Sequence, residues 1–148
     1  MMGDLRELYQ ELILDHNQNP RNFGELDDAT ATANGFNPLC GDRLTLYLRM
    51  IGDVVEDLKF VGTGCAISKA SASIMTTVLK GKTREEAFDL FEMFQKMATT
   101  GELPNGDLGK LAVLSGVYKY PVRVKCAVLA WHTAKSALAG KNTLTKTE

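Results

Sequence analysis

Apolar residues near the start of the chain recur at helical spacing. Asp4 and Glu7 have the spacing of a capping box, in which an N-cap acid is followed three residues later by Glu. The apolar positions that then share one helical face are Leu5, Leu8, Tyr9, Leu12 and Ile13. This pattern predicts an amphipathic helix that ends near Asp15 or His16, because the next segment, 17–24, contains Pro and Gly.

The following segments alternate apolar and polar side chains, as β-strands do. From Ala29 to Ala33, alanines alternate with threonines. The next strand has one apolar and one polar face: Leu44, Leu46, Leu48 and Met50 against Arg43, Thr45, Tyr47 and Arg49. Gly52-Asp53 suits a two-residue hairpin turn into a third strand, 54–61. Three antiparallel strands with one apolar face require a layer of helices over that face.

Two helices are predicted directly after the strands. A stripe of apolar and small residues runs from Ile67 to Val78, and Gly81 ends that helix. Thr83 and Glu86 then form a second capping box. The apolar stripe of the helix that it opens is Ala87, Phe88, Phe91 and Phe94.

The remaining segment is less regular and ends in a further helix. Residues 99–120 are rich in Gly and predict only a short helix near 108–114. Pro121 is well placed to start the last helix, which runs to about Ala139. The polar residues 141–148 are expected to form a disordered tail.

These elements predict one α+β domain over residues 1–148, with a three-stranded antiparallel sheet packed on about five helices. A hydrophobic content of 45% in 148 residues is enough for a single core. Lys plus Arg count 17 against 18 for Asp plus Glu, so the charge excludes the basic surface of a nucleic-acid-binding protein. We see no signal peptide and no apolar run of the ~20 residues that a membrane span needs, and expect a cytoplasmic protein.

The chain has three cysteines, Cys40, Cys65 and Cys126, spread widely along the sequence. An odd number does not suit a disulfide framework. In a reducing compartment such cysteines are buried, nucleophilic or metal-ligating.

Asp42 follows Cys40 by two residues and opens the second strand. Strand parity places Asp42 on the apolar face with Leu44, and Cys40 as well if the extended backbone reaches back that far. An inward-facing carboxylate is costly unless it is paired or binds a metal. The alternative is an Asx turn or strand-end cap with a solvated carboxylate.

Cys65 lies where a strand passes through Gly62 and Gly64 into a helix. The backbone N–H groups and the dipole of a helix N-terminus favour thiolate, the form needed for metal binding and for nucleophilic attack.

Cys126 lies off the main apolar stripe of the last helix, and a buried inert cysteine is the alternative there. Arg123 is one turn away, and a cation beside a thiol lowers its pKa. Arg123 and Lys125 would also offset the negative charge of a site made of three thiolates and a carboxylate. His16 is interpreted as structural, through a hydrogen bond, and His132 as packed or solvated.

Four ordered motifs resemble the SufU proteins, which are relatives of the IscU iron–sulfur scaffold proteins. The matching segments are Asp15-His16 with Asn19-Pro20-Arg21-Asn22-Phe23-Gly24, Asn37-Pro38-Leu39-Cys40-Gly41-Asp42, Gly62 to Ser71, and Tyr120 to Ala127. The resemblance implies an IscU/SufU-like fold and one zinc ion held by Cys40, Asp42, Cys65 and Cys126. It also implies a PLP-dependent cysteine desulfurase of the SufS type as partner.

Two features separate the SufU branch from IscU-type scaffolds. Those scaffolds carry His immediately before the third cysteine, where this chain has Lys125. The chain also has the longer segment, Thr99 to Lys119, of the SufU branch. A charged lysine is a poor metal ligand, so the pattern favours sulfur transfer over cluster assembly.

The resulting hypothesis is a zinc-dependent sulfurtransferase for iron–sulfur cluster assembly. Cys40 is the predicted persulfide acceptor, because Gly41 and the loop before it leave it freest to move. A downstream iron–sulfur scaffold would receive the sulfur. The alternatives are an IscU-like scaffold for a [2Fe–2S] cluster and a non-catalytic zinc adaptor that activates the desulfurase. A cysteine hydrolase is disfavoured, since no motif ties a His or Asp to a cysteine.

Overall fold

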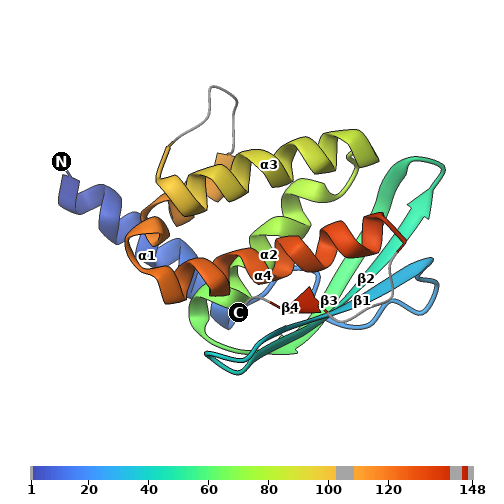
Figure 1. Cartoon of the computed structure of the whole chain (residues 1–148), viewed down its shortest axis with the longest axis horizontal. Helices are drawn as coiled ribbons and strands as arrows, with labels where there is room; N and C mark the ends of the chain where they lie inside the picture. The colour runs from blue at the N-terminus through green and yellow to red at the C-terminus, as the bar shows by residue number, and fades with distance from the viewer. Residues whose placement is uncertain (1, 103–108, 141–144, 147–148) are drawn as a thin grey trace.

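A computed structural model describes residues 2–102, 109–140 and 145–146; the side chains of residues 2–9, 109–110 and 145–146 are outside that description. The elements, shown in Figure 1, are α1 (Met2–Gln18), β1 (Ala31–Asn37), β2 (Asp42–Ile51), β3 (Val54–Thr63), α2 (Ala66–Leu79), α3 (Arg84–Thr100), the 3-10 helix η1 (Gly109–Lys119), α4 (Pro121–Leu138) and β4 (Thr145–Lys146). Three antiparallel strands and five helices in these residues confirm the predicted α+β fold.

The sheet has the strand order β3-β2-β1-β4. β1, β2 and β3 form an antiparallel meander, and the β2–β3 turn lies at Gly52-Asp53 as predicted, because Ile51 pairs with Val54. β4 was not predicted. Its two residues pair in parallel with β1, whereas the rest of the expected tail, 141–144 and 147–148, lies outside the described residues.

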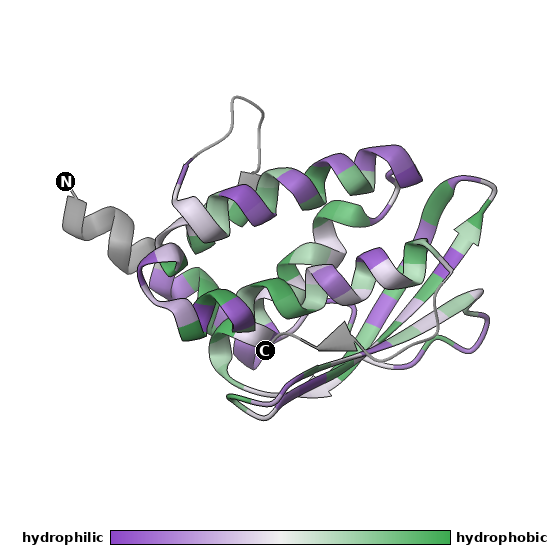
Figure 2. Ribbon diagram, in the orientation of Figure 1, coloured by the Kyte–Doolittle hydropathy of each residue, from purple (hydrophilic) through white to green (hydrophobic). Residues whose placement is uncertain are grey.

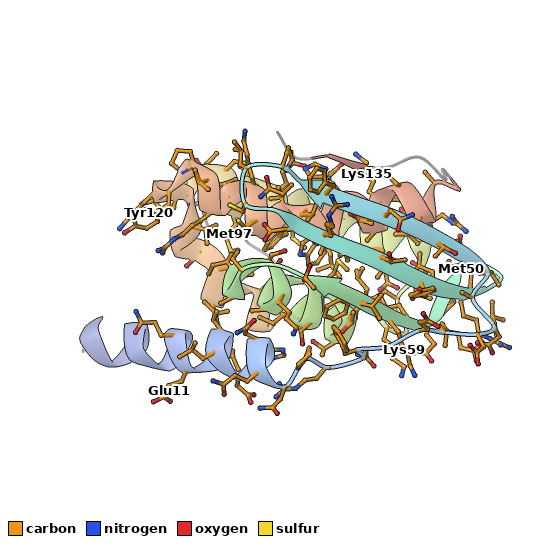
Figure 3. The ribbon with its side chains drawn as sticks, turned by 90° about the horizontal axis from the view of Figure 1, so that it is seen from below. Glu11, Met50, Lys59, Met97, Tyr120 and Lys135 are labelled. Atoms are coloured by element: carbon orange, nitrogen blue, oxygen red, sulfur yellow. The ribbon has the colours of Figure 1, made fainter. Side chains whose placement is uncertain are left out.

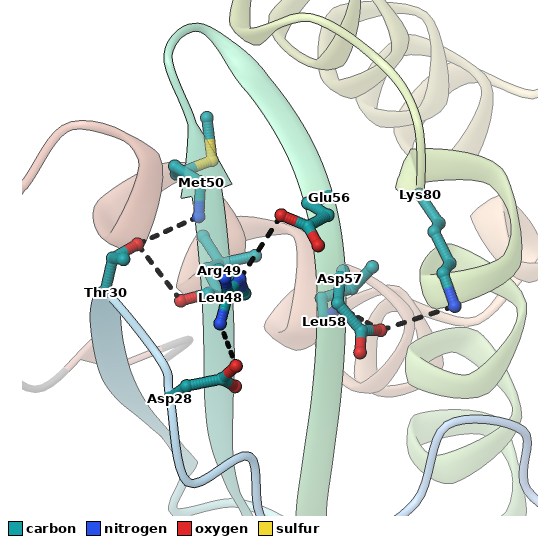
Figure 4. Close-up of polar contacts among 9 residues, drawn as sticks. All are labelled: Asp28, Thr30, Leu48, Arg49, Met50, Glu56, Asp57, Leu58 and Lys80. Atoms are coloured by element: carbon teal, nitrogen blue, oxygen red, sulfur yellow. Dashed lines mark hydrogen bonds and ion pairs between the residues drawn. The ribbon is translucent and has the colours of Figure 1, made fainter.

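The two faces of the sheet differ as the alternation in β2 predicts. Leu44, Leu46 and Leu48 are buried under the helices. On the other face, Arg49 pairs with Asp28 and with Glu56, in part-exposed ion pairs that Figure 4 shows beside the β2–β3 hairpin. Figure 3 views the molecule from below and shows polar side chains along this outer surface. Exposed ion pairs contribute little to the free energy of unfolding, so the sheet is stabilised mainly by its buried inner face.

α2 and α4 lie between the sheet and α3, as Figure 1 shows. Trp131 of α4 stacks on Phe94 of α3 with 4.7 Å between ring centroids, and both side chains are buried. α4 also contacts β1. This packing joins the outer helix to the sheet through α4. Green, hydrophobic segments appear along the ribbons of α2, α3 and α4 in Figure 2, and these helices supply much of the buried core.

The helix boundaries follow local signals. Thr83 and Glu86 form the predicted capping box, with reciprocal hydrogen bonds of 3.1 and 3.0 Å. The short helix expected near 108–114 is the longer 3-10 helix η1, whereas the side chains of Asp4 and Glu7 lie outside the described residues. Within the described residues, no helix has the length and apolar character to cross a bilayer.

Gly35 of β1 lies directly under α4, with no room for a side chain between the strand and the helix. A Cβ at this position would overlap the Thr133 hydroxyl and lie 3.1 Å from a methyl group of Leu129. We expect Gly35→Ala to lower the free energy of unfolding by ~1–3 kcal/mol through overpacking. The measurement is urea denaturation. Gly116→Ala is the control, since a Cβ there meets open space, and an equal loss in both variants would contradict the prediction.

Candidate metal centre

The loop between β1 and β2 carries Cys40 at one end of the sheet. Asn37 and Asp42 are the last residue pair of the two strands, so the loop consists of the four exposed residues 38–41. The Asn37 carbonyl accepts a hydrogen bond from Gly41 N at 2.9 Å, and Gly41 has a φ of 71°. A left-handed φ favours glycine, so Gly41 allows the turn that presents Cys40.

Asp42 is completely buried, with 0% exposure. Its Oδ1 accepts from the backbone N of Cys65 at 2.9 Å, and its Oδ2 accepts from Asn37 Nδ2 at 3.0 Å. A Cβ at Gly64 would overlap Oδ1, so the glycine lets the carboxylate reach the start of α2. The predicted inward orientation of Asp42 is therefore confirmed, and the alternative of a solvated carboxylate is wrong.

Cys126 is 2% exposed and brings α4 into the site. Its Sγ lies 3.4 Å from Cys40 Sγ and accepts a long hydrogen bond, 3.6 Å, from Asn37 Nδ2. The ligand atoms of Cys40, Asp42 and Cys126 all lie within 4.8 Å of one another. The structure thus places two sulfurs and a carboxylate oxygen close enough to bind a single ion.

The surroundings of Cys126 favour a cation. Burial raises the pKa of its thiol, and contacts with Cys65, Asp42 and Cys40 raise it further. This direction is opposite to the lowering expected from Arg123, because Arg123 is exposed and its guanidinium lies over the Tyr120 ring, 4.8 Å from the centroid. A bound divalent metal stabilises thiolate directly, so the donor set fits a metal such as zinc.

Cys65 is the N-cap residue of α2, which confirms its predicted place at a helix N-terminus. Its half-buried Sγ accepts from Ser68 N at 3.4 Å, and its backbone N donates to Asp42. The thiol also contacts Cys126 closely enough to raise the pKa there. Among the described residues, the ligand atoms that all lie within 4.8 Å of one another belong to Cys40, Asp42 and Cys126. Cys65, the fourth predicted ligand, lies beside this group and not in it.

The other predicted residues lie around this centre or have structural roles. Lys125 is half-buried next to Cys126. His16 is buried and shares a 2.7 Å hydrogen bond with Ser73, which confirms its structural interpretation. The His132 ring packs edge-on against Phe91, and burial, with a smaller effect of the nearby Lys135 charge, lowers the pKa of His132.

Asn37 contacts two of the candidate ligands, although no pattern in the sequence pointed to a role for it. Its position could have indicated the role, because Asn37 pairs with Asp42 where β1 and β2 meet the four-residue loop. Buried amides at such positions are hydrogen-bonded, and here the partners are site residues.

Comparisons with known proteins agree with the predicted resemblance. Residues 8–127 match the family described as the NifU-like N terminal domain. The chain is 44% identical to the zinc-dependent sulfurtransferase SufU of Bacillus subtilis, over 93% of each chain. It is 45% identical to the iron–sulfur cluster assembly scaffold protein IscU of Thermotoga maritima, over 88% of this chain and 92% of that protein.

Solved structures show the same fold. A candidate iron–sulfur cluster assembly scaffold protein for the SUF system, from Fervidobacterium islandicum, superposes with a TM-score of 0.82. The two are 38% identical, over 86% of this chain and 94% of that one. A NifU-like N-terminal protein from Brucella abortus is 26% identical with a TM-score of 0.81, over 88% and 92% of the two chains. The chain therefore belongs to the NifU-like N-terminal domain family, and within it resembles both SufU and IscU proteins.

Proposed function

We propose that the protein is a zinc-dependent sulfur acceptor that takes persulfide sulfur from a cysteine desulfurase for iron–sulfur cluster assembly. The observation that carries this proposal is an exposed thiol, Cys40, within 4.8 Å of the buried ligand atoms of Asp42 and Cys126. The name of the Bacillus subtilis relative, a zinc-dependent sulfurtransferase, supports it.

The proposed zinc ligands are Cys40, Asp42, Cys65 and Cys126. Three thiolates and one carboxylate form a tetrahedral set that zinc accepts. Cys65 completes the set because its thiol contacts that of Cys126, and its Sγ otherwise accepts a long hydrogen bond, 3.4 Å, from Ser68 N. Bound zinc would keep the sulfurs as thiolates at neutral pH without changing oxidation state. Lys125 and Arg123, at the start of α4, would offset the negative charge of the ligands.

Cys40 is the proposed acceptor, because exposure differs among the three thiols. Cys40 is exposed, Cys65 is half-buried and Cys126 is buried. Leu39, next to Cys40, is 59% exposed, so the whole loop is open to a partner protein. Cys126 lies in the packed helix α4 and Cys65 caps the packed helix α2, and these positions suit anchoring roles.

The transfer proposed for Cys40 is a thiol exchange with the desulfurase persulfide. The Cys40 thiolate attacks the outer sulfur, and a new S–S bond forms between that sulfur and Cys40 Sγ. The bond between the outer sulfur and the desulfurase cysteine breaks, and that cysteine leaves as a thiolate. The donor is a PLP-dependent cysteine desulfurase of the SufS type, and a downstream iron–sulfur scaffold then takes the sulfur.

A second candidate function is the assembly of a [2Fe–2S] cluster on the same residues. The 45% identity to the IscU scaffold protein of Thermotoga maritima favours it. Lys125, where IscU-type scaffolds carry His, argues against it, since a charged lysine is a poor ligand. Iron and sulfide in protein purified without oxygen would support the scaffold function over sulfur transfer.

Metal content tests the proposed ligands. Freshly purified protein is expected to hold one zinc ion per chain. Asp42→Ala should weaken zinc binding by more than about 100-fold, because removing a ligand should cost at least as much as removing a residue that supports one. Competition with a chromophoric chelator measures the affinity. Asp53→Ala is the matched control, since Asp53 is exposed and pairs with Arg84. Unchanged zinc affinity in Asp42→Ala would exclude this carboxylate as a ligand.

Sulfur uptake tests the acceptor. With desulfurase and ³⁵S-cysteine, Cys40→Ser should take up no more radioactivity than a mixture lacking this chain, because the serine hydroxyl is a poor nucleophile towards sulfur. Desulfurase turnover is measured in the same samples. Stimulation that survives in Cys40→Ser would instead support the non-catalytic zinc adaptor, and normal labelling of the variant would rule out Cys40 as acceptor.

A further inference from the structure

Asn37 occupies the inner face at the end of β1, directly across from Asp42. It is completely buried, with 0% exposure. Three groups around the candidate metal centre bond to its side chain: the Asp42 carboxylate, the Cys126 sulfur and the backbone N–H of Leu39. They belong to β2, α4 and the loop that carries Cys40.

The chemistry of these partners leaves one orientation for the Asn37 amide. An ionised carboxylate only accepts hydrogen bonds, so the donating Nδ2 faces Asp42 Oδ2, at 3.0 Å. A backbone N–H only donates, so the accepting Oδ1 faces Leu39 N, at 3.3 Å. In the same orientation Nδ2 lies 3.6 Å from Cys126 Sγ. Both ends of the amide are therefore used, and the side chain cannot turn without losing these bonds.

We propose that Asn37 is a positioning residue that holds Asp42, Cys126 and the Cys40 loop in the arrangement that binds the metal. The identity of that metal as zinc rests on the proposed function. The neutral N–H donor lies between two groups that are both anionic when they bind metal, and it reduces their mutual repulsion. The Oδ1 bond to Leu39 N, with the Asn37 carbonyl bond to Gly41 N, brackets Cys40 on both sides.

The amide cannot be replaced by a residue of similar shape without a specific cost. Asn37→Asp keeps the size of the side chain but turns the donor into an acceptor that faces Asp42 Oδ2 in a buried site. Asn37→Ala leaves Asp42 Oδ2 with one fewer donor. Residues that orient ligands in this way typically affect metal affinity by ~10–100-fold.

The test compares Asn37→Ala and Asn37→Asp with the same two substitutions at Asn34. Asn34 lies on the same strand but is exposed on its outer face, where it bonds only to Thr45 among the described side chains. Both Asn37 variants should bind zinc about 10–100-fold more weakly than wild type, and the Asn34 variants within about twofold of it. The absorption spectrum of the Co²⁺-substituted protein should shift in the Asn37 variants alone, which a loss of stability by itself would not produce. Thermal unfolding of the metal-free proteins verifies that each variant is folded.

A second readout needs no metal and also serves if a variant loses zinc altogether. In metal-free protein, the oxidant diamide removes two electrons and two protons from a pair of thiols, forms the S–S bond and is itself reduced to the hydrazine. The 3.4 Å separation of Cys40 and Cys126 predicts that this pair closes first in wild type. Peptide mass spectrometry identifies the pair, and the Asn37 variants should form this disulfide several-fold more slowly than the Asn34 variants.

The outcomes separate this inference from the proposed function. If the wild-type chain binds zinc, wild-type zinc affinity in folded Asn37→Ala overturns the positioning role. If the wild-type chain binds no zinc, the proposed function fails, and the disulfide rate alone decides the role of Asn37. In that case equal rates in the Asn37 and Asn34 variants, or a wild-type chain that prefers another cysteine pair, overturn it.

Discussion

The buried carboxylate of Asp42 is the constraint on which the candidate centre depends. An ionised group with no exposure to water must find its hydrogen bonds within the protein. Asp42 finds one at the amide of Asn37 and the other at the backbone N of Cys65. These two bonds join the end of the β1–β2 hairpin to the first residue before α2. The requirement to satisfy one carboxylate therefore brings Cys65 and the Cys40 loop to the same end of the sheet.

α4 adds the third cysteine through packing. Gly35 lets α4 approach β1, and Trp131 stacks on Phe94 to fasten the same helix to α3. With α4 held from both sides, Cys126 is carried to within 3.4 Å of Cys40 Sγ. Ligands on packed helices and strands are held more accurately than ligands on loops. The three candidate thiols thus differ in exposure, and only Cys40 belongs to an open loop.

This difference in exposure is what the proposed sulfur acceptor requires and a purely structural metal site does not. A structural zinc site needs four closed ligands, whereas an acceptor needs one thiol that a partner's persulfide can reach. Cys40, between the exposed residues Leu39 and Gly41, meets the second requirement. Cys126 suits a closed ligand position, because it is buried on a packed helix. Burial and its neighbours raise the pKa of its thiol, and a bound cation would favour the thiolate.

Local rules were enough to predict much of the fold and one half of the centre. The period of two in β2 established that Asp42 faces inward, and the Thr83–Glu86 capping box located the start of α3. The glycines before Cys65 placed that cysteine at a helix N-terminus. Each of these conclusions depends on residues a few positions apart, whose relation the backbone geometry determines.

Only the tertiary structure decided which side chains meet. Cys40 and Cys126 are 86 residues apart, and their contact depends on how α4 packs on the sheet, which no local period encodes. For the same reason the sequence could not reveal that the Asn37 amide reaches Cys126. Sequence by itself determined which residues could bind a metal and which face Asp42 takes. The packing of helices against strands determined that three of the four candidates converge and which of them stays exposed.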